Sequence, residues 1–182
     1  MTRFDDIYEI AADNYGLVTF AEALEAGVTS VELRRFVTTG RLERRGQGVY
    51  KLTKYIPTSY DQYAEAVALV GPGSYIHGES VLALHNLALV NPLRTSVATP
   101  KRIRKTLPDW IRVVAADSND VIVIYEGIPC QSVCDALRYC RGRVMKDRLD
   151  DAVRKAVQEG LIDETEETSL REELNYGVSR AS

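Results

Sequence analysis

Two Thr-x-x-Glu signatures in the first third of the chain constrain its fold more than any other feature. Thr19 is followed three residues later by Glu22, and Thr29 by Glu32. In such a pair the Thr hydroxyl and the Glu carboxylate cap each other's backbone N–H groups, which is typical of a helix N-terminus. Gly27 lies between the two pairs and readily adopts the left-handed conformation that ends a helix. The spacing therefore predicts two short helices joined by a tight turn, the second over residues 30–39.

The segments on either side of this helix pair add a helix before it and a β-hairpin after it. Residues 4–14 carry apolar side chains at helical spacing, which predicts a preceding helix. After Gly40, residues 41–44 and 49–52 read as strands around a glycine-containing turn at 45–48, which predicts a β-hairpin. This is the order of a winged helix-turn-helix. We expect its core to contain Ile7, Leu24, Leu33, Phe36 and Val49.

The predicted helix-turn-helix and hairpin carry a charge opposite in sign to that of the whole chain. Residues 33–54 hold seven Arg and Lys and one acid, so their net charge is 7 − 1 = +6 in a chain of net charge −3. A local basic surface attracts phosphates, and a helix that presents Arg outward can read base edges in the major groove. The pattern predicts an interface for double-stranded DNA made by Thr29, Ser30, Arg34, Arg35, Thr38, Arg44, Arg45, Gln47 and Lys51. The alternatives are a solvated basic face or a winged helix that binds another protein.

Composition shifts divide the rest of the chain from this segment. Pro57-Thr58-Ser59 reads as a linker, so we expect a winged-helix domain at residues 1–56 and a mixed α/β domain at residues 60–182. In the second domain the pattern predicts helices at 60–70, 81–89, 130–139 and 145–159, and a last acidic helix that includes Leu170 and Leu174. It predicts strands at 93–99, 111–115 and 121–125. The fold class expected for the whole chain is α+β.

The hairpin and two later stretches resemble a bacterial family. Gly40-Arg-Leu-Glu-Arg-Arg-Gly-Gln-Gly-Val-Tyr50 resembles the wing of AbiE-type (AbiEi) antitoxins, and the segment from Ile76 to Leu87 is similar to that family's His–Ser–Leu–His stretch. Gly127-Ile128-Pro129 and the helix closed by Gly160-Leu161 also fit, so the resemblance covers about residues 5–176. It implies a winged helix followed by an α/β antitoxin domain. It further implies repression of the chain's own operon at inverted repeats and neutralisation of a nucleotidyltransferase-type toxin, as in type IV toxin–antitoxin (abortive infection) pairs.

Other chemistry is poorly supported by the sequence. His77-x-Glu79 lacks the Cys-x-x-Cys partner of a zinc deaminase, because Cys130 and Cys134 are separated by three residues, so we expect no metal site and no cofactor. His77 and Ser80 are expected to satisfy backbone groups at a helix start, and His85 and Cys134 to pack in the core. The basic cluster Lys101–Lys105 is expected to be a solvated loop, with DNA flanks or an acidic partner as the alternatives.

Three functions remain open at this point. A DNA-binding repressor and antitoxin, not an enzyme, fits the residues best; a nuclease-like enzyme and a protein-interaction module are the alternatives. The polar start of the chain, the odd number of cysteines and the lack of a long apolar run favour a cytoplasmic protein without a membrane segment.

Overall fold

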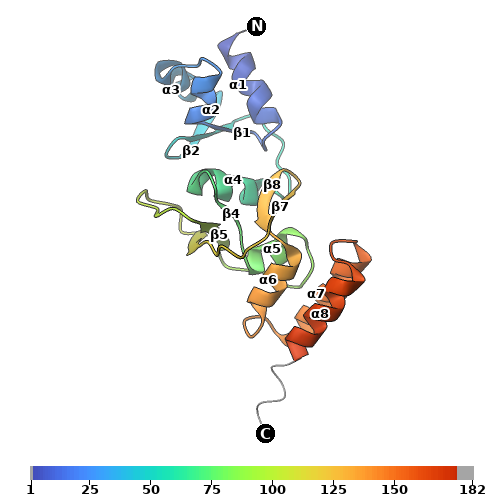
Figure 1. Ribbon diagram of the computed structural model, residues 1–182. Helices are drawn as coiled ribbons and strands as arrows, with labels where there is room; N and C mark the ends of the chain where they lie inside the picture. Colours follow the sequence, from blue (N-terminus) through green and yellow to red (C-terminus); the bar gives the residue numbers. More distant parts are fainter. Residues whose placement is uncertain (1, 176–182) are drawn as a thin grey trace. The chain divides into compact units, whose positions relative to one another are not determined.

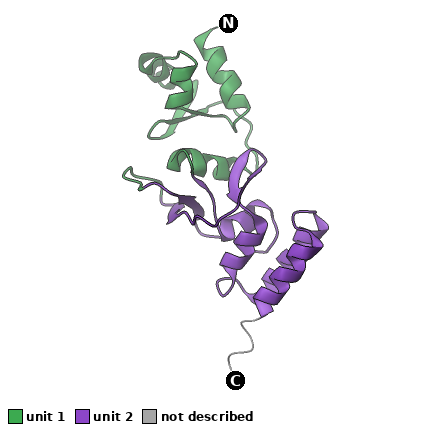
Figure 2. Ribbon diagram, in the orientation of Figure 1, with its two compact units in different colours: residues 1–73, 102–108 green, residues 74–101, 109–182 purple. Residues whose placement is uncertain are grey.

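The computed structural model describes residues 2–175 and has the mixed α+β fold that the sequence predicts. It divides into two compact units: residues 1–73 with 102–108, and residues 74–101 with 109–182 (Figure 2). The predicted linker at 57–59 thus falls inside the first unit, and the following helix groups with the N-terminal elements. Residues 176–182, the end of the predicted second domain, lie outside the described residues.

The first unit contains the predicted helices and hairpin (Figure 1). Helix α1 (Arg3–Ala12) and the short strand β1 (Leu17–Thr19) precede α2 (Phe20–Glu25) and α3 (Ser30–Thr38). Strands β2 (Leu42–Gly46) and β3 (Val49–Leu52) form the hairpin, and β1 pairs with β3 to give an antiparallel sheet of order β1-β3-β2. Helix α4 (Asp61–Val70) follows the hairpin and also belongs to this unit. The helix-turn-helix and its wing are therefore confirmed.

Both predicted capping boxes are formed. The Thr19 backbone N–H donates to Glu22 Oε2 at 2.7 Å, and the Thr29 N–H donates to Glu32 Oε2 at 2.8 Å. The Glu22 and Glu32 N–H groups each donate to the Thr hydroxyl at 3.2 Å. These reciprocal bonds satisfy N–H groups that a helix start leaves unpaired, so the local sequence alone fixes where α2 and α3 begin.

The core of the first unit contains four of the five predicted residues. Ile7, Leu33, Phe36 and Val49 are buried. Leu24 is wrong as a core residue, since 48% of it is exposed. One position along a helix turns a side chain by about 100°, and α2 instead buries the neighbouring Ala23 against the rest of the core.

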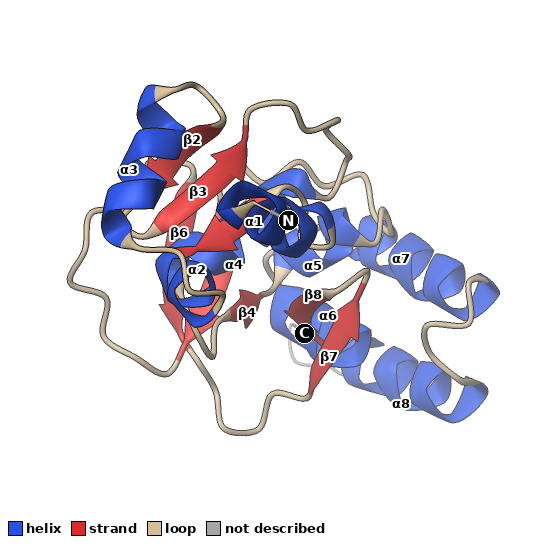
Figure 3. Cartoon of the chain, turned by 90° about the horizontal axis from the view of Figure 1, so that it is seen from above, coloured by secondary structure: helices blue, strands red, loops and turns tan. Residues whose placement is uncertain are grey.

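The second unit is built on a five-stranded mixed sheet of order β6-β5-β4-β8-β7. Its strands are β4 (Tyr75–Ile76), β5 (Thr95–Thr99), β6 (Ile111–Ala115), β7 (Ile122–Tyr125) and β8 (Ile128–Gln131). Its helices are α5 (Glu79–Leu84), α6 (Val133–Cys140), α7 (Lys146–Gln158) and α8 (Glu164–Asn175), and the last two lie side by side (Figure 3).

Two strands of this sheet were not expected from the sequence. β4 has only two residues, and β8 includes Cys130, which the sequence pattern places in a helix. The helix α6 starts three residues later, where the Ser132 hydroxyl accepts a hydrogen bond from the Asp135 N–H at 3.2 Å. The helix predicted to start at Cys130 is therefore corrected, because a side-chain cap and not hydrophobic spacing decides its first turn.

Candidate nucleic-acid interface

Helix α3 has a buried and a solvent-exposed face. Leu33 and Phe36 are buried, whereas the predicted DNA contacts Ser30, Arg34, Arg35 and Thr38 are exposed. The structure thus brings these four residues to one helix and points them away from the core.

Val31 also lies on the exposed face of α3, and the sequence analysis missed it. The residue is 73% exposed, although valine is among the residues most often buried. A helical wheel centred on Leu33 would have located it, because two positions along the helix correspond to a turn of about 200°. An exposed apolar side chain among arginines suits contact with a thymine methyl group.

The two arginines of this face keep their charge available. No ion pair joins Arg34 or Arg35 to a carboxylate within residues 2–175. The Thr38 hydroxyl donates to the Arg34 carbonyl at 2.9 Å. Thr29 differs from the other predicted contacts, because its hydroxyl is used in the capping box with Glu32.

The wing presents one predicted arginine to solvent and pairs another with carboxylates of the first unit. Arg44 and Gln47 are exposed near the tip, where the pairing register shifts between Arg44 and Gly46. The Arg44 Nε donates to the Gly46 carbonyl at 3.3 Å. Arg45 instead donates to Glu65 of α4 at 2.9 Å and to Glu43 at 3.0 Å. The hydrogen bond to Glu65 is the main cause of a raised pKa of Arg45.

Lys51 is also paired with α4. Its Nζ lies 2.6 Å from Asp61 Oδ2, and both side chains are largely buried. Burial of Asp61 opposes ionisation, but the hydrogen bonds from Lys51 and Thr58 outweigh it, so the pKa of Asp61 is lowered. Two cations that the sequence assigned to DNA therefore have carboxylate partners within the protein.

The residues weighed for other chemistry lie in the second unit. Ser80 Oγ accepts a hydrogen bond from the Ser96 N–H at 2.8 Å, so this residue satisfies a backbone group of strand β5 and not, as predicted, one at a helix start. His77 does not: its Nδ1 is buried without a hydrogen-bond partner, and its Nε2 lies 3.9 Å from Asp120 Oδ2. His85 and Cys134 are buried as predicted, and burial lowers the pKa of His85 to about 4.

Neither a metal cluster nor a membrane helix is found in the part of the chain that the structure describes. No group of three or more His, Cys, Asp or Glu side chains within residues 2–175 is placed to hold a metal ion. No helix in the same range has both the length and the apolar character needed to cross a bilayer. In the predicted basic cluster, Arg102 to Lys105 belong to the segment that groups with the first unit.

The helix pair, the wing and the exposed cationic face together define the winged helix-turn-helix class. Residues 5–53 match the family model described as "Transcriptional regulator, AbiEi antitoxin". The predicted resemblance to AbiEi antitoxins is confirmed for this segment. No curated protein matches the chain. Among solved structures, the RV2827C protein from Mycobacterium tuberculosis is similar over 95% of this chain and 82% of its own, with 14% identity and a TM-score of 0.45.

Proposed function

We propose that this chain is a DNA-binding transcriptional repressor that acts as the antitoxin of a type IV toxin–antitoxin pair and represses its own operon. The observation that carries the proposal is the exposed face of α3, where Arg34 and Arg35 have no carboxylate partner among residues 2–175, inside a segment that matches the AbiEi family model. An Arg pair on a recognition helix fits guanine edges and phosphates.

The proposed contacts follow from what each side chain already binds. Ser30, Arg34, Arg35 and Thr38 would approach the major groove together with Val31, and Arg44 and Gln47 would approach the backbone from the wing. Thr29, Arg45 and Lys51 are engaged within the protein, so we propose that they mainly hold α3 and the wing in place. In this proposal the chain acts by binding in the cytoplasm and has no catalytic step of its own.

The DNA-binding part is tested by titrating the protein onto a duplex from its own upstream region and onto a scrambled duplex. Arg35→Ala should weaken binding to the specific duplex by about 1–3 kcal/mol and relax the preference at one base pair. Arg154→Gln is the matched control, because Arg154 is an exposed arginine on α7. Equal affinity of Arg35→Ala and the unmodified chain for the specific duplex would show that α3 does not read the operator.

The antitoxin part needs a separate experiment. A nucleotidyltransferase-type gene next to the chain's own gene would be expressed with and without it, and growth measured. We expect the toxin to arrest growth and the full chain to restore it. Continued arrest in the presence of the folded chain would remove the antitoxin assignment and leave the DNA-binding one standing.

A further inference from the structure

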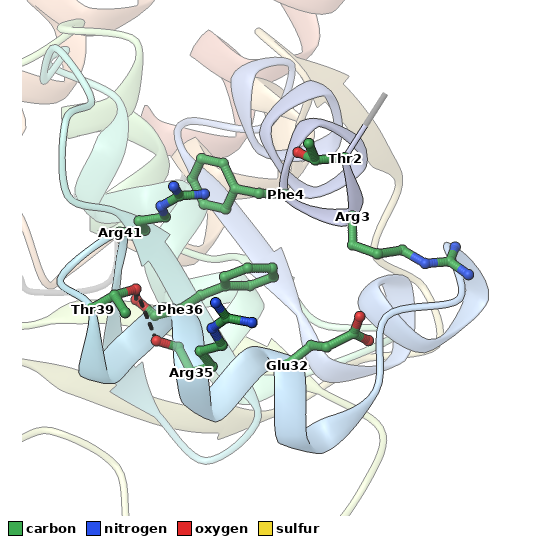
Figure 4. A pocket seen from close by; sticks show the side chains of 8 residues that line it. All are labelled: Thr2, Arg3, Phe4, Glu32, Arg35, Phe36, Thr39 and Arg41. Atoms are coloured by element: carbon green, nitrogen blue, oxygen red, sulfur yellow. Dashed lines mark hydrogen bonds between the residues drawn. The ribbon is translucent and has the colours of Figure 1, made fainter.

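A cavity of about 380 Å³ lies between the N-terminal end of α1 and one side of α3, within the first unit (Figure 4). The lining side chains come from α1 and its N-cap, from α3 and its C-cap, and from the start of the hairpin: Thr2, Arg3, Phe4, Glu32, Arg35, Phe36, Thr39 and Arg41.

Two phenyl rings and Arg41 form a fixed wall of this cavity. The rings of Phe4 and Phe36 meet edge to face, with centroids 5.1 Å apart. The Arg41 guanidinium carbon lies 4.8 Å from the centroid of the Phe4 ring. The Arg41 backbone is held as well: its N–H donates to the Phe36 carbonyl at 2.9 Å, and its carbonyl accepts from the Thr53 N–H at 3.1 Å. A guanidinium stacked on a ring keeps its edge donors available for an anion.

The cations of the cavity exceed its acids. Three arginines line it with a single carboxylate, that of Glu32. This carboxylate already accepts from the Thr29 N–H and hydroxyl, at 2.8 and 2.9 Å. Figure 4 shows the guanidinium groups of Arg35 and Arg41 on the side of the phenyl rings, and the Arg3 guanidinium and the Glu32 carboxylate toward the other side. Like charges gathered beside an apolar wall repel each other, and a bound anion would remove that repulsion.

We propose that this cavity binds a phosphate group between Arg41 and Arg35. Phosphate suits two guanidinium groups because each can present two parallel N–H donors to its oxygens. The phosphate has two sources, the DNA backbone or a free phosphate compound. The first source rests on the proposed function: a backbone phosphate at this point would fix the depth of α3 in the groove, since Arg35 belongs to that helix. The phosphate would take two of the five N–H donors of Arg35 and leave the others for a base edge.

The DNA source is tested with Arg41→Gln, because Arg41 lies outside the face of α3 proposed to read bases. Its affinity for the operator and for a scrambled duplex should fall by the same factor, and the slope of log K against log salt should decrease by about 0.9, the value for one phosphate contact. Arg154→Gln should change neither quantity. Thermal melting of each variant checks that the unit remains folded.

The free-phosphate source is tested on the unmodified chain without DNA. Inorganic phosphate is titrated while the side-chain Nε–H signals of Arg35 and Arg41 are followed by NMR, with chloride as the control anion. Saturable shifts in the unmodified chain but not in Arg41→Gln support the phosphate site, whichever way the DNA titration turns out. The equal loss on both duplexes, without such shifts, supports the DNA backbone as the source.

The proposal is overturned if Arg41→Gln keeps the salt slope and both affinities and phosphate causes no saturable shift. That outcome leaves the proposed function intact as long as Arg35→Ala weakens operator binding. If the unmodified chain binds no duplex at all, the proposed function fails, and the phosphate titration alone decides whether the cavity is a phosphate site.

Discussion

Arg45→Ala should destabilise the first unit, because it leaves the Glu65 carboxylate buried without its cation. The Glu65 side chain is 7% exposed and that of Arg45 is 35% exposed. Loss of one partner of a fully buried pair costs about 3–5 kcal/mol, and an exposed pair is worth about 0–1 kcal/mol. The half-exposed Arg45–Glu65 pair lies between these limits, so we expect a loss of about 2 kcal/mol in the free energy of unfolding.

A double-mutant cycle with Glu65→Gln isolates this pair. The neutral amide needs no counter-charge, so Arg45→Ala should cost at least about 1 kcal/mol less in the Glu65→Gln chain than in the unmodified chain. Glu43→Gln is the matched control, because Glu43 also contacts Arg45 at 3.0 Å but is 61% exposed. Its coupling to Arg45→Ala should stay below about 0.5 kcal/mol.

Urea denaturation at neutral pH measures all these variants. A coupling between Arg45 and Glu65 below about 0.5 kcal/mol would refute the structural role of the pair. The cycle also decides how Arg45 acts on DNA. The Glu65→Gln variant and the double variant differ only in Arg45, and neither contains the buried Glu65 carboxylate. A loss of affinity in that comparison would report a phosphate contact, as the sequence alone suggested.

Three further outcomes are expected. Phe36→Ala should lower the free energy of unfolding by about 3–5 kcal/mol, since the ring is buried against Phe4; an unchanged urea midpoint would contradict this. The folded-state pKa of His85 is depressed, so stability is full above pH 6.5 and should fall by up to about 1.4 kcal/mol per pH unit between pH 6.5 and 4; His85→Leu should flatten that decline in a pH series of urea melts. Residues 58–182, expressed alone, should melt cooperatively if the boundary predicted at 57–59 is a domain boundary, and a molten fragment would favour the division at 73/74.

The elements that the sequence predicted well are those decided by local chemistry. The starts of α2 and α3 depend on Thr and Glu side chains three residues apart, and both were located correctly. The hairpin depends on its glycines and alternating strands, and α7 on a long apolar stripe. In each case the residues that decide the structure are neighbours in the chain, so a single sequence contains the whole argument.

The wrong predictions concern features that are decided by residues far apart in the sequence. β4 has two residues and is defined by its pairing with Val97 and Ala98 in β5 and with Cys130 in β8, far away in the sequence. The orientation of Leu24 depends on which side of the six-residue α2 faces the core. Such features are set by tertiary packing. Elements this short have too few residues to show a periodic apolar pattern in the sequence.

The net charge of residues 33–54 shows that contacts between distant residues also affect a prediction of function. The sum of +6 over residues 33–54 omits the acids Asp61 and Glu65, which lie beyond the window but pair with Lys51 and Arg45. With them included, the local charge is 6 − 2 = +4. Helix α4 thus neutralises Arg45 and Lys51 of the β2–β3 hairpin, while Arg34 and Arg35 on α3 keep their charge. If α3 reads bases as proposed, a phosphate backbone would be attracted mainly to that helix, which favours specific contacts over uniform attraction to a basic surface.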